Sequence, residues 1–203
     1  MSRGLGDVYK RQALLANHPE MKDVVRRYMG GREFINNIER YCLWFDGVDL
    51  SKYNFPEVRE RLAAVRDSRL SSPTKSVVEA ASTPALFTQI RQPKTSYLAI
   101  PEVSSSRRKY IPVGFIDSSV IASNKLRFIP SDDMYLFGLL ASQAQMAWMR
   151  IVSGRLKSDY SYSPAVWNSF IFPRATSEQE REIREASNHV LEARELYADC
   201  LLY

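Results

Sequence analysis

The sequence predicts an α+β fold in which short strands form a small mixed or antiparallel sheet packed with helices, followed by a C-terminal helix. Three observations carry this prediction. Stretches with apolar residues at helical spacing alternate with short apolar and aromatic runs. Proline and serine interrupt the central part of the chain at short intervals. A capping-box sequence begins the last amphipathic stretch, near residue 176.

The first half of the chain combines helices with one strand. Residues 19–29 read as a short helix that ends at a Gly-Gly pair. Residues 40–45 are rich in aromatic side chains, which is typical of a buried strand. Pro56 suits a first helical position, and the apolar residues after it keep helical spacing until the Ser-Ser-Pro-Thr sequence at 71–74.

The central part of the chain has a sequence pattern typical of short strands. We expect strands at 87–90, 97–100 and 110–116, each bounded by proline or serine. Because proline lacks a backbone N–H, Pro101 and Pro112 favour edge strands or strand ends over a central position.

Helices dominate the remainder. The Ser-Asp-Asp sequence at 131–133 predicts an N-cap, and we expect one helix from about 132 to 152, ended by Gly154. A short helical turn is expected at 164–170, before the C-terminal helix, whose capping box pairs Thr176 with Gln179 or Ser177 with Glu180. The residues expected to face the core are Phe137, Leu140, Ala144, Trp148 and Ile151 in the first helix, and Ile183, Ala186, Val190, Ala193 and Leu196 in the last.

Composition excludes several classes of protein. The 28 Lys and Arg exceed the 23 Asp and Glu by five, which favours polyanionic partners. The absence of a long uncharged apolar run argues against a membrane span. Two cysteines cannot cross-link a chain of 203 residues, so we expect a reducing, cytoplasmic compartment. His18 and His189 are too few and too far apart for a histidine-based metal site.

Positive charge is concentrated in two segments. Residues 91–127 hold seven Lys and Arg against two Asp and Glu, and residues 150–174 hold four against one. Residues 175–203 hold three against seven, so the end of the chain is acidic. A charged run is often only a solvated face, so any evidence for binding has to come from the residues within these segments.

The first candidate binding segment is the Ser-Ser-Ser-Arg-Arg-Lys-Tyr sequence at 104–110. Its cations, Arg107, Arg108 and Lys109, stand beside hydroxyls and an aromatic ring, a combination that suits contact with phosphates. A solvated loop with an ordinary basic cluster is the alternative interpretation.

The second candidate lies in the expected 132–152 helix. If Ala144 and Trp148 face the core, Ser142 and Gln145 fall on the opposite side, at 100° per residue. Gln143 and Gln145 are suited to base reading, because a glutamine amide can pair with adenine at N6 and N7. A polar solvent face is the alternative.

The third candidate is the segment 154–163, in which cations alternate with tyrosines. Arg155 and Lys157 can contact phosphates, and Tyr160 and Tyr162 can stack on bases. The alternative, left open at this level, is a loop whose tyrosines cap the core.

No catalytic constellation is present in the sequence. It has neither a glycine-rich phosphate loop nor a metal-spaced Cys/His set. Asp132 and Asp133 are adjacent and point apart on a helix, which suits capping better than acid–base catalysis. Cys42 lies within an apolar strand and is expected to be an inert core thiol. We therefore assign no catalytic residue and no metal ligand.

Several blocks in order resemble the target-recognition domain of MmeI-type DNA modification enzymes. The most specific is Gly-Arg-Leu-Lys-Ser-Asp-Tyr at 154–160, followed by Tyr162-Ser163. The other matching blocks are 34–44, 97–101, 106–114, 137–150, 166–168 and 170–173.

This resemblance implies a function that composition does not show. Such enzymes are S-adenosylmethionine-dependent adenine-N6 DNA methyltransferases, some fused to an endonuclease that requires Mg. Their recognition domain reads a short asymmetric site on double-stranded DNA, while an upstream domain flips and methylates the adenine. By resemblance, Ser142, Gln143 and Gln145 and the segment 157–162 would face DNA. Gln145 replaces an expected histidine, which suggests an altered sequence preference, and Ser169 interrupts an asparagine-rich pattern.

The resemblance also implies a domain organisation. We expect a DNA target-recognition domain over 13–173 and the start of a C-terminal helical segment over 174–199. The methylation and cofactor motifs of the family are absent, so the chain reads as a fragment whose missing upstream methyltransferase domain binds S-adenosylmethionine. Residues 1–12 and 200–203 resemble translated sequencing-adapter sequence and are expected to be a non-native leader and tail. A freestanding nucleic-acid-binding specificity subunit and a protein-interaction module that uses the acidic last helix are the alternative functions.

Overall fold

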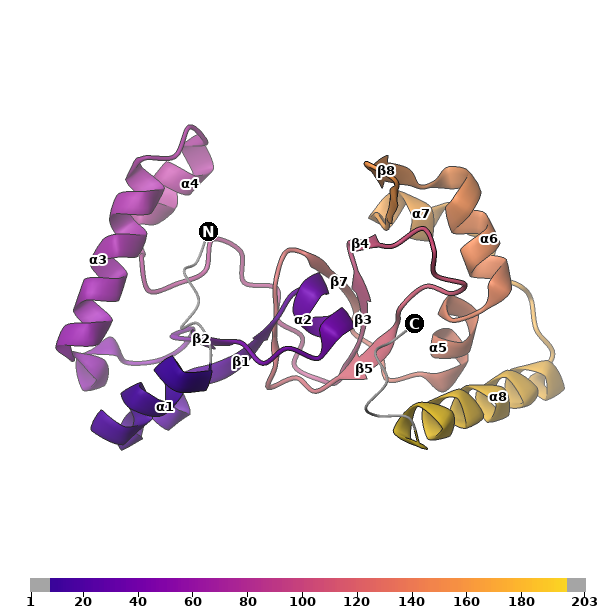
Figure 1. Cartoon of the computed structure of the whole chain (residues 1–203), viewed down its shortest axis with the longest axis horizontal. Coiled ribbons are helices and arrows are strands. Elements are labelled where there is room, and N and C mark those ends of the chain that lie inside the picture. The colour runs from indigo at the N-terminus through magenta and orange to yellow at the C-terminus, as the bar shows by residue number, and fades with distance from the viewer. Residues whose placement is uncertain (1–7, 197–203) are drawn as a thin grey trace. The chain divides into compact units, whose positions relative to one another are not determined.

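The computed structural model describes residues 8–196, which divide into two compact units (Figure 1). Unit 1 comprises the described residues up to Tyr28 together with Glu39–Gln92, and unit 2 comprises Met29–Ile38 together with the described residues from Pro93 onward. The expected tail at 200–203 lies outside the described residues, as does the expected leader apart from residues 8–12, which begin helix α1.

Unit 1 consists mainly of helices around one pair of strands. Its elements are α1 (Val8–Asn17), the 3₁₀ helix η1 (Pro19–Asp23), β1 (Val25–Met29, whose last residue belongs to unit 2), β2 (Tyr41–Leu43), η2 (Leu50–Tyr53), α3 (Pro56–Leu70), α4 (Lys75–Glu79) and η3 (Ala80–Ser82).

Unit 2 contains short strands and the longer C-terminal helices. Its elements are α2 (Gly31–Asn36), β3 (Tyr97–Pro101), β4 (Val103–Ser104), β5 (Gly114–Ile116), β6 (Ile121–Ala122), β7 (Leu126–Ile129), α5 (Met134–Leu140), α6 (Gln143–Val152), β8 (Gly154–Leu156), β9 (Asp159–Ser161), α7 (Pro164–Asn168) and α8 (Ser177–Leu196). The α+β class, its short antiparallel strands and its C-terminal helix are confirmed. No helix in the described part of the chain is long and apolar enough to cross a membrane.

The helix expected over 19–29 is wrong. Only Pro19–Asp23 forms a helical turn, and Val25–Met29 is a strand that pairs antiparallel with β2, with Val25 opposite Leu43. The strand begins at the β-branched Val25, which favours the extended conformation, and the apolar residues of β2 supply the partner. The strand and the Pro56 helix expected in this region are confirmed as β2 and α3.

The strand expected at 87–90 is also absent. Arg69 of α3 is 5% exposed and donates hydrogen bonds to the carbonyls of Ala80, Thr83 and Leu86 at 2.6–2.9 Å, which holds the preceding loop against the helix. The Phe87 ring then packs on aromatic side chains of unit 1 instead of joining a sheet. A buried arginine therefore decides the path of this segment.

The core of unit 2 is built on β3, the central strand of the sheet β5-β3-β7. All five residues of β3 are buried, because alternate side chains enter two different apolar clusters, Leu98 and Ile100 one and Tyr97 and Ala99 the other. The edge position that we considered for this strand is wrong, whereas Pro101 does occupy its end. The strand expected over 110–116 is confirmed only from Gly114, after Pro112.

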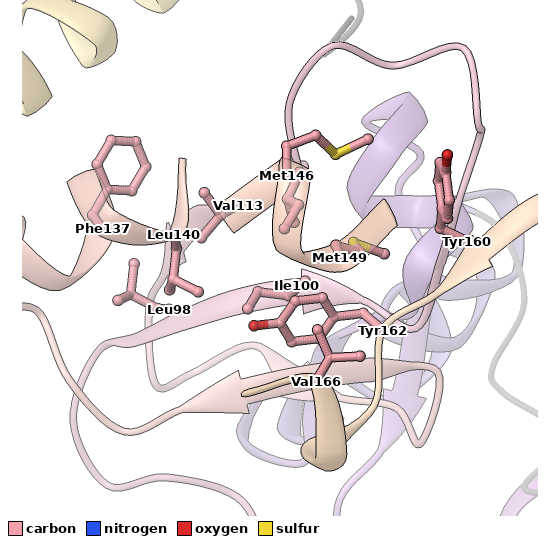
Figure 2. Packing of buried hydrophobic residues seen from close by; sticks show 11 residues of the cluster. Leu98, Ile100, Val113, Phe137, Leu140, Met146, Met149, Tyr160, Tyr162 and Val166 are labelled. Carbon is pink, nitrogen blue, oxygen red and sulfur yellow. The ribbon is translucent and has the colours of Figure 1, made fainter. Parts of the chain in front are cut away.

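The first of these clusters joins elements that are distant in the sequence. Figure 2 shows its side chains, which come from β3, α5, α6, β9 and the residue that follows it, α7 and the segment before β5. Its members are Leu98, Ile100, Ile111, Val113, Phe137, Leu140, Met146, Met149, Tyr160, Tyr162 and Val166. This cluster supports the surface elements described in the next subsection.

The single helix expected over 132–152 is two helices. Asp133 caps α5 by accepting a hydrogen bond from the Tyr135 N–H at 2.8 Å. Ser142 then caps α6, since its Oγ accepts from the Gln145 N–H at 3.1 Å and donates to the Leu139 carbonyl at 2.6 Å. Serine competes in this way with the helical ladder, which explains the break.

Helix α8 packs against α5 (Figure 1), through a face other than the expected one. Its Thr176–Gln179 capping box is confirmed, with hydrogen bonds of 2.9 and 3.3 Å. The contact with α5 uses Ser187, which is 2% exposed and lies beside Gly138. Of the stripe expected to face the core, only Ile183 is half-buried; the exposed members are Ala186, Val190, Ala193 and Leu196.

Candidate nucleic-acid interface

A second sheet of unit 2, with strand order β4-β9-β8, brings the two basic segments together. Strand β4 pairs antiparallel with β9, which places Ser104 opposite Tyr160, and β9 pairs with β8, which places Arg155 opposite Tyr160. The 105–110 loop therefore leaves the same small sheet that ends in the β8–β9 hairpin. About 50 residues of sequence separate these segments, so only the strand pairing makes them neighbours.

The basic loop is held to the hairpin by its backbone. The Ser106 N–H donates to Asp159 Oδ1 at 3.2 Å, and the Arg108 N–H donates to the Ser105 carbonyl at 3.1 Å, closing a turn. Within this turn Arg107 and Lys109 are exposed and Arg108 is half-buried. The loop thus presents at least two cations to solvent from a fixed backbone.

The hairpin presents two more cations. Lys157 sits at its turn in the left-handed region, with φ of 58°, and is exposed. The Arg155 guanidinium lies 4.3 Å from the centroid of the Tyr160 ring, and its Nη1 donates to the Ser158 carbonyl at 2.9 Å. Stacking of this kind restricts the arginine side chain before any ligand binds.

The two tyrosines of this segment belong to the core. Tyr160 and Tyr162 are 7% and 3% exposed, so the structure favours the interpretation that they cap the core over the one in which they stack on bases. The Tyr162 hydroxyl accepts a hydrogen bond from Gln145 Nε2 at 3.2 Å. Burial raises the pKa of Tyr162 to about 12, an effect that the hydrogen bond from Gln145 opposes.

The expected orientation of α6 is wrong. Gln145 is 1% exposed and faces the core with Met146 and Met149, whereas Ala144 is exposed and Trp148 is only half-buried. The prediction assumed one continuous helix, so it continued the spacing of Phe137 and Leu140 to find the buried face. Because the chain breaks at Ser142, α6 takes a register of its own. Gln145 therefore does not face solvent as a base-reading residue would.

Of the three helix residues proposed from sequence, Gln143 is the one that is exposed. Its Nε2 donates to the Tyr110 hydroxyl at 3.3 Å, which joins the basic loop to the start of α6. Ser142 is half-buried and its hydroxyl is engaged in capping α6. Sequence reasoning missed Arg150, which is also exposed on α6 and contributed only to the charge of its segment. Its spacing of seven residues from Gln143 could have identified it, because that spacing places both side chains on the same side of a helix.

Some of the positive charge counted from sequence is already neutralised. Lys125 Nζ and Arg127 Nη2 each lie 2.7 Å from a carboxylate oxygen of Glu102. The carbonyl of Glu102 also accepts from the Tyr162 N–H at 2.7 Å, so this ion-pair cluster is attached to the end of β9. At least two of the seven cations in 91–127 are therefore paired with a carboxylate. Across residues 8–196, no three His, Cys, Asp or Glu side chains gather where they could hold a metal ion.

Comparison with known proteins gives consistent matches. The family model described as MmeI, target recognition domain, matches residues 6–174. DNA methyltransferase A of Bacillus subtilis (strain 168) is 34% identical over 180 residues, which cover 88% of this chain and 20% of that protein. A solved structure of the Type IIL restriction-modification enzyme MmeI in complex with DNA superposes with a TM-score of 0.95 at 41% identity, covering 99% of this chain and 27% of that one. This chain thus spans about a fifth of the curated relative and about a quarter of the solved one. The chain belongs to the MmeI target recognition domain family.

Proposed function

We propose that this chain recognises a specific sequence of double-stranded DNA, as the recognition part of a longer DNA methyltransferase. Family membership supports this proposal, together with the relatives, of which one is named a DNA methyltransferase and another was solved with DNA. The observation that carries it is the β4-β9-β8 sheet, which joins the 105–110 loop and the β8–β9 hairpin in one small sheet of unit 2.

The exposed cations of this sheet are the proposed phosphate contacts. Arg107, Lys109, Arg155 and Lys157 are exposed, and Arg108 lies half-buried among them. Neutralising phosphates with such side chains releases condensed counterions, so binding of this kind weakens steeply as salt rises. Phosphate contacts fix the position of a protein on the duplex but do not themselves read its sequence.

Gln143 is the proposed base-reading residue. It is exposed at the start of α6, and the hydrogen bond with Tyr110 holds its amide beside the basic loop. A glutamine amide can make two hydrogen bonds with adenine in the major groove. Gln145, Ser142, Tyr160 and Tyr162 would then act by positioning α6 and the hairpin, since their polar groups or rings are engaged within the fold.

The activity of the longer protein is part of the proposal. We propose that it methylates adenine at N6 in a prokaryotic cytoplasm, with S-adenosylmethionine as methyl donor held by an upstream methyltransferase domain. Where an endonuclease is fused, Mg would serve that domain. We assign none of the described residues to either cofactor.

The experiment that tests recognition is selection from a randomised duplex pool by the 203-residue chain. We expect an enriched sequence, bound with an affinity that falls steeply between 50 and 200 mM salt. Gln143→Ala should change the preferred base at one position, with about 1–3 kcal/mol less discrimination. Lys157→Ala should weaken binding to all sequences alike, and Lys75→Ala, which removes an exposed cation of unit 1, is the matched control.

Two results would contradict the proposal. The chain would not be a DNA-recognition domain if it bound no duplex in a salt-dependent manner. If Lys157→Ala changed base preference and Gln143→Ala weakened every sequence equally, the roles of reader and anchor would be reversed.

A further inference from the structure

The side chain of Tyr110 reaches from the end of the basic loop to the first residue of α6. Its hydroxyl accepts a hydrogen bond from Gln143 Nε2 at 3.3 Å, between residues that are 33 positions apart in sequence. Tyr110 is 43% exposed, and Gln143 is exposed as well. Polar side chains of two different elements therefore meet at the surface of unit 2, within reach of a ligand.

The backbone on both sides of Tyr110 is anchored to the fold. Before it, the Ser106 N–H donates to Asp159 Oδ1 at 3.2 Å, which holds the loop to the β8–β9 hairpin. After it, Ile111 is 2% exposed and belongs to the core cluster of unit 2. The Tyr110 ring thus leaves a fixed segment, and its hydroxyl has a defined place beside α6.

The first turn of α6 is fixed in the same way. Ser142 caps the helix through its hydrogen bond with the Gln145 N–H, and Gln145 and Met146 are buried in the core. Gln143 lies between the cap and these buried residues, so its backbone is held while its side chain remains exposed. A long exposed side chain loses conformational entropy when it binds, and a hydrogen bond formed beforehand reduces that loss.

The orientation of a glutamine amide decides which base edge it fits. Adenine presents an acceptor at N7 and a donor at N6, so the amide must offer its N–H to N7 and its carbonyl to N6. Turning the amide over exchanges these two groups and places acceptor beside acceptor. A freely rotating amide can also offer its N–H to O4 of thymine or its carbonyl to N4 of cytosine. An amide held in one orientation therefore discriminates more strictly among bases.

The hydrogen bond with Tyr110 leaves groups of the amide for a base. A glutamine amide has two N–H donors and one carbonyl acceptor. The Tyr110 hydroxyl accepts one of these N–H groups, so the carbonyl and the other N–H remain. These are one acceptor and one donor, which is the combination that adenine requires.

We infer that Tyr110 is a specificity-determining residue of this chain, because its hydroxyl holds the Gln143 amide in the orientation that selects adenine. The inference rests on the proposed function, in which Gln143 reads a base of the duplex. Tyr110 acts through Gln143, so it is a positioning residue and need not touch the base. It determines how strictly one base is chosen, whereas the exposed cations nearby determine how tightly every duplex is bound.

The test removes only the hydroxyl from the 203-residue chain. Tyr110→Phe keeps the ring and should lower the preference for adenine at the position read by Gln143 about two- to tenfold, the net contribution of one hydrogen bond. Duplexes with another base at this position should be bound as before, and the slope of log K against log salt should not change. The matched control is Tyr9→Phe, which removes the hydroxyl of an exposed tyrosine of unit 1 and should leave base preference unaltered.

A double variant separates positioning from an independent contact. In the Gln143→Ala chain, Tyr110→Phe should have no further effect on base preference, because the hydroxyl then has no amide to orient. The thermal unfolding midpoint of Tyr110→Phe should equal that of the unaltered chain, since both hydrogen-bonded groups belong to exposed side chains. A changed base preference in a chain of unchanged stability would be the result that supports the inference.

The other outcomes overturn it in distinguishable ways. If the chain binds no duplex, or if Gln143→Ala leaves base preference unaltered, the proposed base reading fails and this inference fails with it. If Gln143→Ala changes the preference and Tyr110→Phe does not, only this inference is overturned. An equal loss of affinity for all duplexes would show that Tyr110 is a general DNA contact, and an equal loss of discrimination with and without Gln143 would show that it reads a base independently.

Discussion

Gln145 shows how a polar side chain can be fixed by one buried partner. It is 1% exposed, and its amide donates to the Tyr162 hydroxyl, which is itself enclosed by the core of unit 2. A buried polar group left without a partner costs about 1–3 kcal/mol, more than the hydrogen bond itself contributes. The pair is therefore expected to stabilise the core and to hold α6 against β9.

We expect Gln145→Ala to lower the free energy of unfolding by about 2–4 kcal/mol, because it leaves a cavity and an unpaired hydroxyl. Gln143→Ala, at an exposed position, should change it by less than about 0.5 kcal/mol. Urea denaturation measures both values. The double variant Gln145→Leu/Tyr162→Phe removes both polar groups and should recover much of the loss. An equal effect of the two alanine substitutions would show that Gln145 is exposed in solution.

Cys42 provides a test that depends on pH. Burial raises the pKa of its thiol to about 12, against the weaker opposing effect of Arg40 and Arg26. Only the thiolate reacts, so at pH 8 about one Cys42 in ten thousand should be reactive in the folded chain. In a Cys200→Ser background, we expect a disulfide reagent to label Cys42 only when urea unfolds the protein. Rapid labelling without urea would contradict this burial.

The same shift predicts how stability changes with pH. The unfolded chain loses the thiol proton near pH 8.5, whereas the folded chain keeps it until about pH 12. The contribution of Cys42 to the free energy of unfolding is therefore fully present below about pH 8.5. It is lost as pH rises from there towards about pH 12.

At the scale of elements, the contact between α5 and α8 determines the orientation of α8. A Cβ atom at Gly138 would lie 2.6 Å from Ile183 Cγ2 and would also meet the Ser187 hydroxyl. The close approach is reinforced beside it, where Arg184 forms an ion pair with Asp133, the N-cap of α5. Arg194, further along α8, donates to the Val113 carbonyl at 2.7 Å. Small residues and two arginines thus determine which face of α8 is packed, and the most apolar stripe of the helix does not.

We expect Gly138→Ala to destabilise the chain by about 1–3 kcal/mol through overpacking against Ile183. Alanine is the better helix former by about 1 kcal/mol, so a helix free of α8 would instead be stabilised. Thermal or urea unfolding decides the sign. The control is Gly154→Ala, where a Cβ meets nothing within 4 Å, and the change should be small.

At the scale of the whole molecule, charge is distributed over both units. Unit 2 exposes Arg107, Lys109, Arg155 and Lys157, and unit 1 exposes cations of its own, among them Arg26, Lys52 and Lys75. Exposed cations held on a folded surface act together on a polyanion, and each phosphate contact adds to the salt dependence. The number of contacts is therefore a property of the whole chain that a titration can count.

We expect a slope of log K against log salt between about −3.6 and −4.5 for the unaltered chain, from about four to five phosphate contacts at about 0.9 each. Fluorescence anisotropy with a labelled duplex at several salt concentrations measures it. A slope near −2 would show that most of these cations do not contact DNA. The acidic outer surface of α8 should contribute nothing, so Glu185→Gln should leave the slope unchanged.

Local signals in the sequence determined the elements whose ends are set by neighbouring residues. Pro56 began α3, Asp133 and Thr176 preceded helices as caps, and the aromatic-rich stretch 40–45 contained the strand β2. Each of these elements depends on contacts between residues a few positions apart, so the local sequence is enough to predict where it begins. The family resemblance likewise followed from ordered blocks and was confirmed by the comparisons.

Only the tertiary structure decided which faces are buried and which basic segments meet. The sequence was ambiguous about α6 and α8 because both helices carry apolar residues on more than one side. Ser142 and Gly138 resolved the ambiguity through contacts with Leu139, Ser187 and Ile183. The pairing of β4 with β9 joins residues more than 50 positions apart, and no local pattern encodes such a register. Residue types therefore indicated the kind of ligand to expect, a polyanion. Long-range packing decided which basic and polar side chains are exposed and could contact it.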